Sequence, residues 1–237
     1  MDADVVLWRR LVLVASGGWG QANDGDLIDE DFILGTNFSR TRSAIDDGRV
    51  YFGTINAGYR LSDWTDAVGR RGFVDLLVGY QYWQEKYEAF GIVDFLGFTG
   101  NEPTSTKVIT ETWTWHSLRI GGRAYFPFPY GLGVRGSAFV MPWNSVEVED
   151  THHLRTDLRH PSIVLDGTGG FGWQLEGAIT YTFWRGLGVE AGYRHWSVEM
   201  KSGDATFRTV NAGESDEDLR KVRTQRGGPF VGLQWRF

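Results

Sequence analysis

The feature that most constrains the fold is a two-residue alternation of apolar with polar or small side chains, clearest in the last segment, 229–237. Neighbouring side chains of an extended chain point to opposite sides, so one face of this segment is apolar and the other is not. The apolar face carries Val231, Leu233, Trp235 and Phe237. Such a strand needs an apolar environment on one side of its sheet and a polar one on the other.

The same alternation recurs in the segments 118–126, 132–140, 173–183 and 187–194. Their second faces carry charges of both signs, namely Arg119, Arg123, Arg135, Glu176, Glu190 and Arg194. Opposite charges can pair across facing strands, as a closed, poorly hydrated interior would require. The sequence therefore predicts an all-β antiparallel barrel with lipid-facing apolar side chains and internal ion pairs. The alternative, a soluble lipocalin-like barrel, would carry its apolar residues inside.

The composition agrees with a transmembrane β-barrel and excludes several other classes. The chain has 32 glycines, 15% aromatic residues and 11 tryptophans, which suit many turns and aromatic belts. It has no apolar run of about 18 residues, so no transmembrane helix is expected. It has no cysteine, which excludes disulfides and cysteine-ligated metals. The net charge of −6 and the lack of a basic patch argue against nucleic-acid binding.

Turn and loop signals predict about eight up-and-down strands in a single domain, 1–237. The strands are expected at about 5–20, 49–62, 72–90, 107–127, 131–147, 169–184, 186–200 and 221–237. Tight turns at 126–131 and 184–186 alternate with longer polar loops near 21–47, 98–106, 148–168 and 201–222, as periplasmic turns and extracellular loops do. Several strands exceed the roughly 9–11 residues that cross a bilayer, so the barrel is expected to extend beyond the membrane. The apolar segment 11–15 is interpreted as part of the first strand rather than as a signal-peptide remnant.

Two short motifs at the loop end combine titratable groups at positions i and i+2 of an extended chain. One is Asp29-Glu30-Asp31 and the other is Asp150-Thr151-His152. Because such positions point to the same side, each motif can present two titratable groups together. A carboxylate pair that faces an Asp–His pair could hold and deprotonate one water molecule.

Two other interpretations of the motifs stay open. Loops are generally polar, so both motifs could be solvated loop residues. Asp29 also lies in an acidic cluster with Asp24 and Asp26, and Ca²⁺ favours several oxygen ligands. No His-x-x-x-His spacing is present, and a zinc site is not expected.

The strand register sets a condition on the second motif. If the inward face is extended from Arg135 without interruption, Asp150 and His152 face outward. A β-bulge or the turn of the loop must therefore intervene for the motif to face the barrel mouth. Pro142 is one place for such a bulge, because proline cannot donate a hydrogen bond to the ladder.

These residues resemble the omptins, outer-membrane proteases of Gram-negative bacteria. Ala15-Ser16-Gly17-Gly18-Trp19, followed by Asp29-Glu30-Asp31-Phe32, resembles the omptin strand and loop that carry an acid pair. Trp143 followed by Asp150-Thr151-His152 has the spacing of the loop that carries the Asp–His pair. The resemblance extends from about residue 11 to Phe237, and the aromatic terminus after a strand is similar to the C-terminal signature of outer-membrane barrels.

The resemblance implies an omptin-like barrel in the bacterial outer membrane and an endopeptidase site. The implied catalytic residues are Asp29, Asp31, Asp150 and His152. It implies peptide or protein substrates at the extracellular face, contact with outer-membrane lipid and lipopolysaccharide, and no metal. It also implies no cofactor, unless lipopolysaccharide is required as in the family. Basic residues that could contact lipopolysaccharide phosphates near the rim are Arg40, Arg42, Arg49, Arg155, Arg159, Arg220, Lys221 and Arg223.

In the expected mechanism, His152 accepts a proton from water, while Asp150 orients the imidazole ring and stabilises its charged form. Asp29 and Asp31 would hold the other side of the water. They could share a proton, because close like charges resist double ionisation. That proton could be donated to the developing oxyanion.

The sequence departs from the omptin pattern at three points. Only eight of the ten family strands are recognised, so an N-terminal hairpin is expected to be missing. The eight strands would still form a complete barrel if residues near 5–14 paired with residues near 226–236. Val148 stands where proteases of the family place an acid that binds a basic side chain, and Thr41 stands where they carry a histidine. These departures leave open whether the protein prefers substrates with Arg or Lys. They also keep a second hypothesis, a non-catalytic barrel with a structural, adhesive or pore role.

Overall fold

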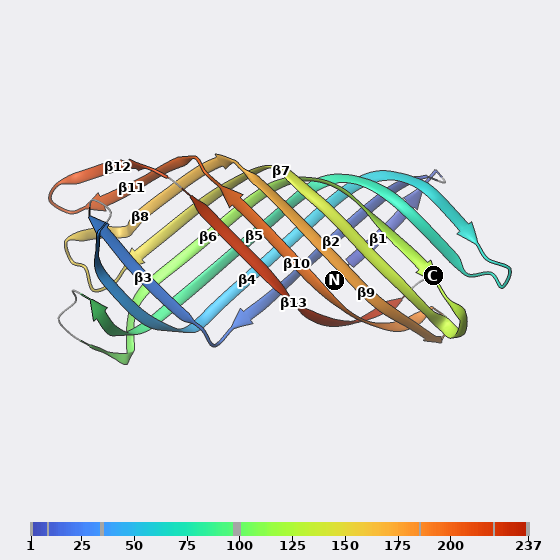
Figure 1. Ribbon diagram of the computed structural model, residues 1–237, viewed down its shortest axis with the longest axis horizontal. Coiled ribbons are helices and arrows are strands. Elements are labelled where there is room, and N and C mark those ends of the chain that lie inside the picture. The colour runs from blue at the N-terminus through green and yellow to red at the C-terminus, as the bar shows by residue number, and fades with distance from the viewer. Residues whose placement is uncertain are drawn as a thin grey trace.

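The computed structural model describes residues 2–8, 10–33, 36–96, 101–184, 186–219 and 221–235, with the backbone alone at 2–3, 31–33, 38, 94–95 and 235. These residues form one antiparallel sheet of 13 strands, rolled into an elongated barrel (Figure 1). The wall consists of β1 (Asp2–Leu7), β2 (Leu11–Ala22), β4 (Thr36–Thr65), β5 (Arg71–Leu96), β6 (Glu102–Pro127), β7 (Leu132–His152), β9 (Phe171–Trp184), β10 (Leu187–Met200) and β13 (Val222–Trp235). No helix among the described residues is long and apolar enough to cross a membrane.

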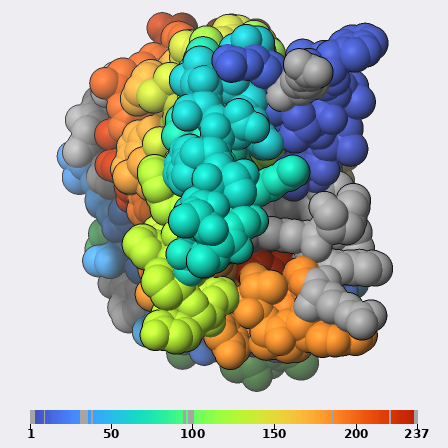
Figure 2. Space-filling model, turned by 90° about the vertical axis from the view of Figure 1, so that its right-hand side faces the viewer, coloured from blue at the N-terminus to red at the C-terminus, as the bar shows by residue number. Residues whose placement is uncertain are grey.

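The two ends of the barrel differ. The right-hand end in Figure 1 carries short connections, including the 3-10 helix η1 (Pro129–Gly131) between β6 and β7. Figure 2 looks at this end and shows the wall segments arranged around the barrel axis. At the left-hand end of Figure 1 the wall is extended by β3 (Asp26–Ile33), β8 (Leu158–Gly169), β11 (Gly203–Thr209) and β12 (Gly213–Asp218). Short turns at one end and long extensions at the other match periplasmic and extracellular ends.

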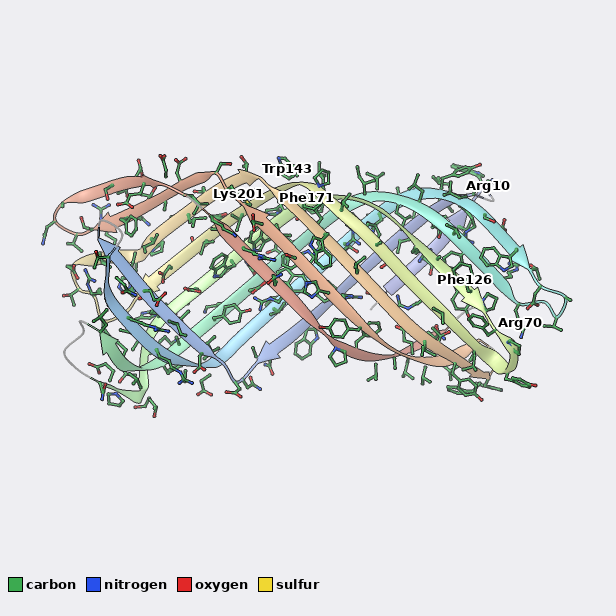
Figure 3. All side chains as sticks on the ribbon, viewed as in Figure 1. Arg10, Arg70, Phe126, Trp143, Phe171 and Lys201 are labelled. Carbon is green, nitrogen blue, oxygen red and sulfur yellow. The ribbon has the colours of Figure 1, made fainter. Side chains whose placement is uncertain are left out.

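The predicted alternation of faces is confirmed around the wall. In β6, the outward side chain of Leu118 is 49% exposed, whereas the next residue, Arg119, is 3% exposed. Phe126, Trp143 and Phe171 lie along the outside of the barrel (Figure 3). Other exposed apolar side chains of the same belt are Tyr51, Ile55, Tyr59, Leu76, Val78, Ile120, Val134, Val140, Leu175, Ile179 and Tyr181. The belt suits contact with lipid and is the opposite of a lipocalin-like arrangement.

The predicted ion pairs cross the interior. Arg135 on β7 donates to both carboxylate oxygens of Glu190 on β10, at 2.6 and 2.9 Å, and also donates to Glu176 on β9. Arg194 on β10 donates to the other oxygen of Glu176. Each of these four charges therefore has an opposite partner inside the barrel, which offsets the cost of removing it from water.

A second group of charges lies nearer the short-turn end. Asp75, whose side chain is fully buried, accepts hydrogen bonds from Arg60 and from Arg123. Arg119 donates to Gln81 at 3.0 Å instead of meeting an acid. The internal positions of all six predicted charged residues are thus confirmed, although Arg119 is hydrogen-bonded to the amide of Gln81 instead of an acid.

The predicted strand boundaries need two corrections. The expected first strand, 5–20, is two strands, β1 and β2, joined by a turn that begins at Trp8, where φ is +43°. The segments expected as loops are mostly strands: β3 and the start of β4 occupy 21–47, the end of β7 and β8 occupy 148–168, and β11 and β12 occupy 201–222. Within 98–106, residues 98–100 lie outside the described part, and β6 begins at Glu102. Polar residues on both faces hid these strands, because above the membrane neither face needs to be apolar.

The ladder that would join the two ends of the sheet is not found among the described residues. β1 pairs with β2, from Asp2 opposite Ser16 to Leu7 opposite Leu11, and β13 pairs with β10. The pairing of residues near 5–14 with residues near 226–236, which would complete the barrel, is therefore not present among the described residues. On β13, Val231 is 84% exposed, about twice the 41% of Val189 on its neighbour β10. This greater exposure is typical of a strand at the edge of a sheet.

Loss of the central internal acid should destabilise the barrel far more than loss of a surface acid. Glu176, with a side chain 4% exposed, contacts two arginines, whereas Glu30, 39% exposed, contacts Arg40 at 3.2 Å. We expect Glu176→Gln to lower the free energy of unfolding by roughly 3–5 kcal/mol, because it leaves buried positive charge uncompensated. We expect Glu30→Gln to change it by less than about 1 kcal/mol. Urea unfolding in detergent micelles measures both values, and similar losses in the two variants would contradict a closed, charge-balanced interior.

Candidate active site

An extra residue in β7 reverses which of its side chains face inward. The β6–β7 register shifts between Leu118 and Ile120, where one residue of β6 faces residues 141–142 of β7. Beyond the shift, the buried residues of β7 are Asn144, Val146 and Val148. Asp150 and His152 continue this inward series. The bulge that the sequence required near Pro142 is therefore present, and it directs the Asp–His motif into the barrel mouth.

A buried asparagine stabilises this bulge. The Asn144 side chain donates to the carbonyl oxygen of Met141 at 3.1 Å and accepts from the hydroxyl of Ser117 at 2.7 Å. An extra residue interrupts ladder hydrogen bonds, and here the side chain satisfies a backbone group that the ladder does not.

The two faces of β3 separate its acidic residues. On the outer face, Asp26 accepts two hydrogen bonds from Arg42, at 2.8 and 2.7 Å, and Glu30 lies 3.2 Å from Arg40. Asp29 lies on the inner face, opposite the buried Thr41 of β4. The acidic cluster noted in the sequence is thus divided between the faces, and no group of acids and histidines among the described residues could hold a metal ion.

An apolar cluster brings the inner face of β3 against β6. Leu27, two residues before Asp29, packs with Ile92 against the buried side chains of Ala89, Val108 and Ile109. Ile109 is directly opposite His152 in the β6–β7 ladder. Burial of these side chains is worth about 25 cal/mol per Å² of apolar surface. The cluster therefore holds β3, which carries Asp29, next to the Asp–His motif.

At this place the His152 imidazole lies between two carboxylates. Its Nε2 is 3.5 Å from Asp29 Oδ2, and its Nδ1 is 3.5 Å from Asp150 Oδ2. The His152 backbone N–H donates to the hydroxyl of the buried Ser162 at 2.9 Å, which fixes the end of β7. The three side chains are partly exposed, so a water molecule and a substrate can reach the ring. The structure thus brings together three of the four residues named from the sequence.

The fourth residue, Asp31, is described only by its backbone, which lies in β3 opposite Ser39. Its side chain lies outside the described part of the chain. Thr41 and Val148, the two departures from the omptin pattern, both lie close to the site: Thr41 is opposite Asp29, and Val148 is buried two residues before Asp150.

Sequence analysis missed a third carboxyl group in this site. Glu111 on β6 is directly opposite Asp150 in the ladder, and its Oε2 accepts a hydrogen bond from the Trp113 indole at 3.1 Å. Burial raises the pKa of Glu111 and is the largest effect; the hydrogen bond from Trp113 lowers it, the nearby charge of Asp29 raises it, and His152 lowers it. A single Glu in a threonine-rich strand gives no signal by itself, and only the β6–β7 register reveals its position.

A rigid polar floor lies below Glu111. Glu85 on β5, whose side chain is 2% exposed, accepts from the Trp83 indole at 2.6 Å, from the Tyr87 hydroxyl at 2.5 Å and from Arg226 Nε at 2.9 Å. Arg226 belongs to β13 and so crosses the barrel. Burial raises the pKa of Tyr87 to about 12, with a smaller contribution from Glu111. The hydrogen bonds of this floor link β5 to β13 across the barrel beneath the site.

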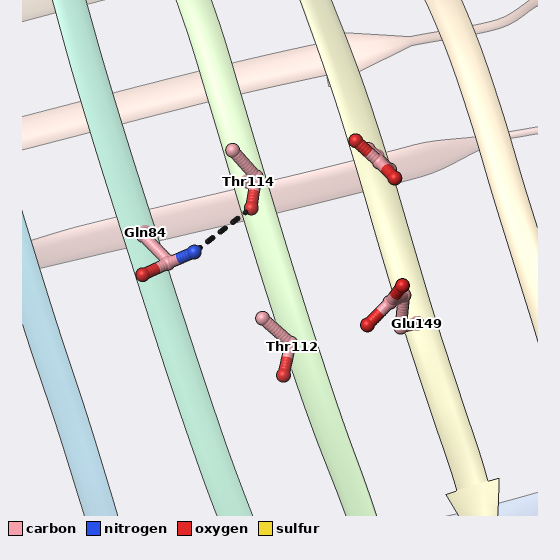
Figure 4. A pocket seen from close by; sticks show the side chains of 5 residues that line it. Gln84, Thr112, Thr114 and Glu149 are labelled. Atoms are coloured by element: carbon pink, nitrogen blue, oxygen red, sulfur yellow. Dashed lines mark hydrogen bonds between the residues drawn. The ribbon is translucent and has the colours of Figure 1, made fainter. Parts of the chain in front are cut away.

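Two nearby features belong to the outer face and not to the site. A pocket of about 230 Å³ is lined by side chains of neighbouring strands, including Gln84, Thr114 and Glu149, and Gln84 donates to Thr114 at 3.3 Å (Figure 4). His153 lies on the opposite side of β7 from His152, where its Nε2 is 2.8 Å from the Thr110 hydroxyl. Burial and the neighbouring His160 lower the pKa of His153.

No family model matches the chain, and no curated protein sequence matches it. Among solved structures, the chain is similar to the outer membrane protease OmpT from Escherichia coli, with a TM-score of 0.81 and 15% sequence identity. The similarity covers 100% of this chain and 82% of that chain. The chain therefore has an omptin-like β-barrel fold, and the apolar belt on its outer surface suits contact with lipid.

Truncation of the apolar cluster should loosen β3 without unfolding the barrel. Ile109→Ala removes a buried side chain at a cost of about 2–5 kcal/mol, and the loss falls on the contact with β3. Since the chain has no cysteine, spin labels at Ile28→Cys and Glu149→Cys would report the distance between β3 and β7 specifically. We expect a broader distance distribution in Ile109→Ala than in the lipid-facing control Leu118→Ala. An unchanged distribution would show that the cluster does not position Asp29.

Proposed function

We propose that this barrel is an endopeptidase of the bacterial outer membrane, which hydrolyses peptide bonds at its extracellular mouth with an activated water molecule. The single observation that supports this function most strongly is the imidazole of His152 between Asp150 and Asp29, each 3.5 Å away. The three groups come from two strands that are distant in sequence, and they meet at a partly exposed place above a closed interior.

In the proposed reaction, the water binds beside the contact of His152 Nε2 with the Asp29 carboxylate, within hydrogen-bond reach of both groups. His152 accepts the proton of the water as it attacks the peptide carbonyl carbon, and later gives that proton to the leaving nitrogen. Asp150 faces Nδ1, so it orients the ring and stabilises the imidazolium that forms. No covalent intermediate with the protein is needed. A positioned histidine base contributes roughly 10²–10⁴-fold, and orientation of the reactants contributes further.

The partners proposed for the barrel are a peptide or protein substrate, outer-membrane lipid and lipopolysaccharide. Many of the cations expected near the rim already have acidic partners: Arg40 with Glu30, Arg42 with Asp26, Arg49 with Asp47, Arg155 with Asp157, Arg159 with Glu214 and Lys221 with Glu199. Arg220 lies outside the described residues. A phosphate group would have to compete with these carboxylates, so the lipopolysaccharide contact rests on the resemblance more than on free positive charge.

The second hypothesis, a non-catalytic barrel, includes a pore, a structural and an adhesive role. The pore is disfavoured by the side chains that cross the interior, since Arg226 reaches Glu85 from the far wall and Arg135 joins Glu176 to Glu190. A structural or adhesive role predicts no turnover of peptides.

Loss of either member of the Asp–His pair should abolish peptide hydrolysis. The refolded protein, in detergent with lipopolysaccharide, is tested on a mixed peptide library, and cleavage is read by mass spectrometry. We expect His152→Ala and Asp150→Ala to lower turnover by at least about 10²-fold, since each removes part of the general base. His153→Ala is the matched control, because this neighbouring histidine faces away from the site, and it should retain turnover. Equal turnover in the parent and all three variants would reject the proposed roles, and no turnover in the parent would favour the non-catalytic hypothesis.

A further inference from the structure

We propose that Glu111 is a further catalytic residue of this site, whose carboxyl group donates a hydrogen bond to the carbonyl oxygen of the peptide bond under attack. The inference rests on the proposed peptidase function and adds the group that stabilises the oxyanion. Sequence analysis assigned that role to a proton shared by Asp29 and Asp31, and the geometry points to a different carboxyl group.

The first argument is position. Tyr87, Glu111 and Asp150 are direct neighbours in one row across β5, β6 and β7. Side chains that are directly opposite in an antiparallel pair have Cβ atoms about 4.5–5.5 Å apart and lie on the same face. Glu111 therefore reaches the same space as Asp150 and His152, on the side of the site away from β8.

The second argument is charge. Asp29 and Asp150 already face the imidazole, and an ionised Glu111 would add a third negative charge next to Asp150. Close carboxylates resist simultaneous ionisation, and the most desolvated one retains the proton. Glu111 is the carboxyl whose pKa is raised by burial, and the Asp29 charge raises it further. The protonated carboxyl group is the form that can donate a hydrogen bond.

The third argument concerns the described groups that surround Glu111, none of which is a cation paired with it. The Trp113 indole donates to Oε2 and holds that oxygen in place; this bond lowers the pKa of Glu111, but burial raises it by more. The hydroxyl of Tyr87 on β5 is directed to Glu85, and Arg226 of β13 is held by Glu85 and Tyr87. The remaining charged or titratable groups that face Glu111 are Asp29 on β3 and Asp150 and His152 on β7. Asp29, Asp150 and His152 are therefore the groups next to Glu111 with which a substrate carbonyl near it would also be in contact.

The reaction balances with Glu111 in this role. The water oxygen forms a bond to the carbonyl carbon, a water proton moves to His152 Nε2, and the π electrons of the carbonyl move to its oxygen. That oxyanion accepts the hydrogen bond from Glu111, which keeps its proton. When the oxyanion collapses, the carbon–nitrogen bond breaks and the proton on His152 moves to the leaving nitrogen. The products are a carboxylic acid and an amine, and no co-reactant other than water is consumed.

The test compares variants that keep or remove the hydrogen-bond donor. Glu111→Gln retains a neutral donor, so we expect kcat within about tenfold of the parent. Glu111→Ala removes it, and we expect kcat to fall by roughly 10²–10³-fold with KM nearly unchanged, because the bond forms in the transition state. Glu149→Gln, which changes an exposed carboxylate on the outer face of β7, controls for the lost charge and should match the parent. Unfolding in urea verifies that each variant is folded.

The pH profile separates this role from a structural one. The kcat of the parent should fall as pH rises through the elevated pKa of Glu111, because the ionised form cannot donate. This alkaline limb should be missing in Glu111→Gln, since an amide does not ionise. A residue that only supports the fold would leave the profile of Glu111→Gln equal to that of the parent, and that result would overturn the proposal.

An infrared measurement reports the protonation state of Glu111 independently of peptide turnover. The difference spectrum between the parent and Glu111→Gln, recorded over a pH series, should contain the carbonyl stretch of a protonated carboxyl group that persists above the pH at which an ordinary Glu ionises. If the parent hydrolyses peptides but Glu111 is ionised, or if Glu111→Ala retains full kcat, this inference fails and the proposed function stands. If the parent hydrolyses no peptide, both fail together, whatever the infrared spectrum shows.

Discussion

The period of two along every strand is the constraint on which the site depends. Each wall strand has one face for lipid or solvent and one for the interior, and a single extra residue exchanges them. In β7 that residue lies at 141–142, between a segment whose odd-numbered residues face inward and one whose even-numbered residues do. The same strand can therefore supply Arg135 to the internal ion pairs and His152 to the mouth. Asn144 stabilises the bulge through its hydrogen bond to Met141, so the geometry of the site depends on a residue outside the site.

Much of the membrane part of the fold could be predicted from the sequence, because lipid on one side enforces alternation. The belt strands, the internal arginines and acids, and the bulge near Pro142 follow from that rule. The part above the membrane could not be predicted in the same way, since water or protein can lie on either side of the sheet there. For this reason β3, β8, β11 and β12 were expected as loops. The turn at Trp8 was missed because the chain on both of its sides is apolar.

The same reasoning separates the site residues that were expected from the one that was not. Asp29, Asp150 and His152 carry a local signal, because their spacing places two titratable groups on one side of an extended chain. Glu111 carries none, since its partners come from β7 and β3 and are set by strand register alone. The contact of β3 with β6 could not be predicted from the sequence either. Leu27 and Ile109 are ordinary apolar residues, and their contact depends on how the β3–β4 hairpin folds over the barrel mouth.

The environment, and not the residue type, distinguishes the carboxylates of the upper wall. On the outer face, strand pairing aligns Glu147, Asp166, Asp204 and Asp218 in one row across β7, β8, β11 and β12, and all four are exposed. In water, two unit charges about 4 Å apart repel by only about 1 kcal/mol, so an exposed row of acids costs little. On the inner face of the same wall, Glu111 and Asp150 are also neighbours, but partial burial strengthens the repulsion and favours retention of a proton. Carboxyl groups on the two faces of one sheet thus form a solvated surface on one side and, on the other, a group suited to donate a hydrogen bond.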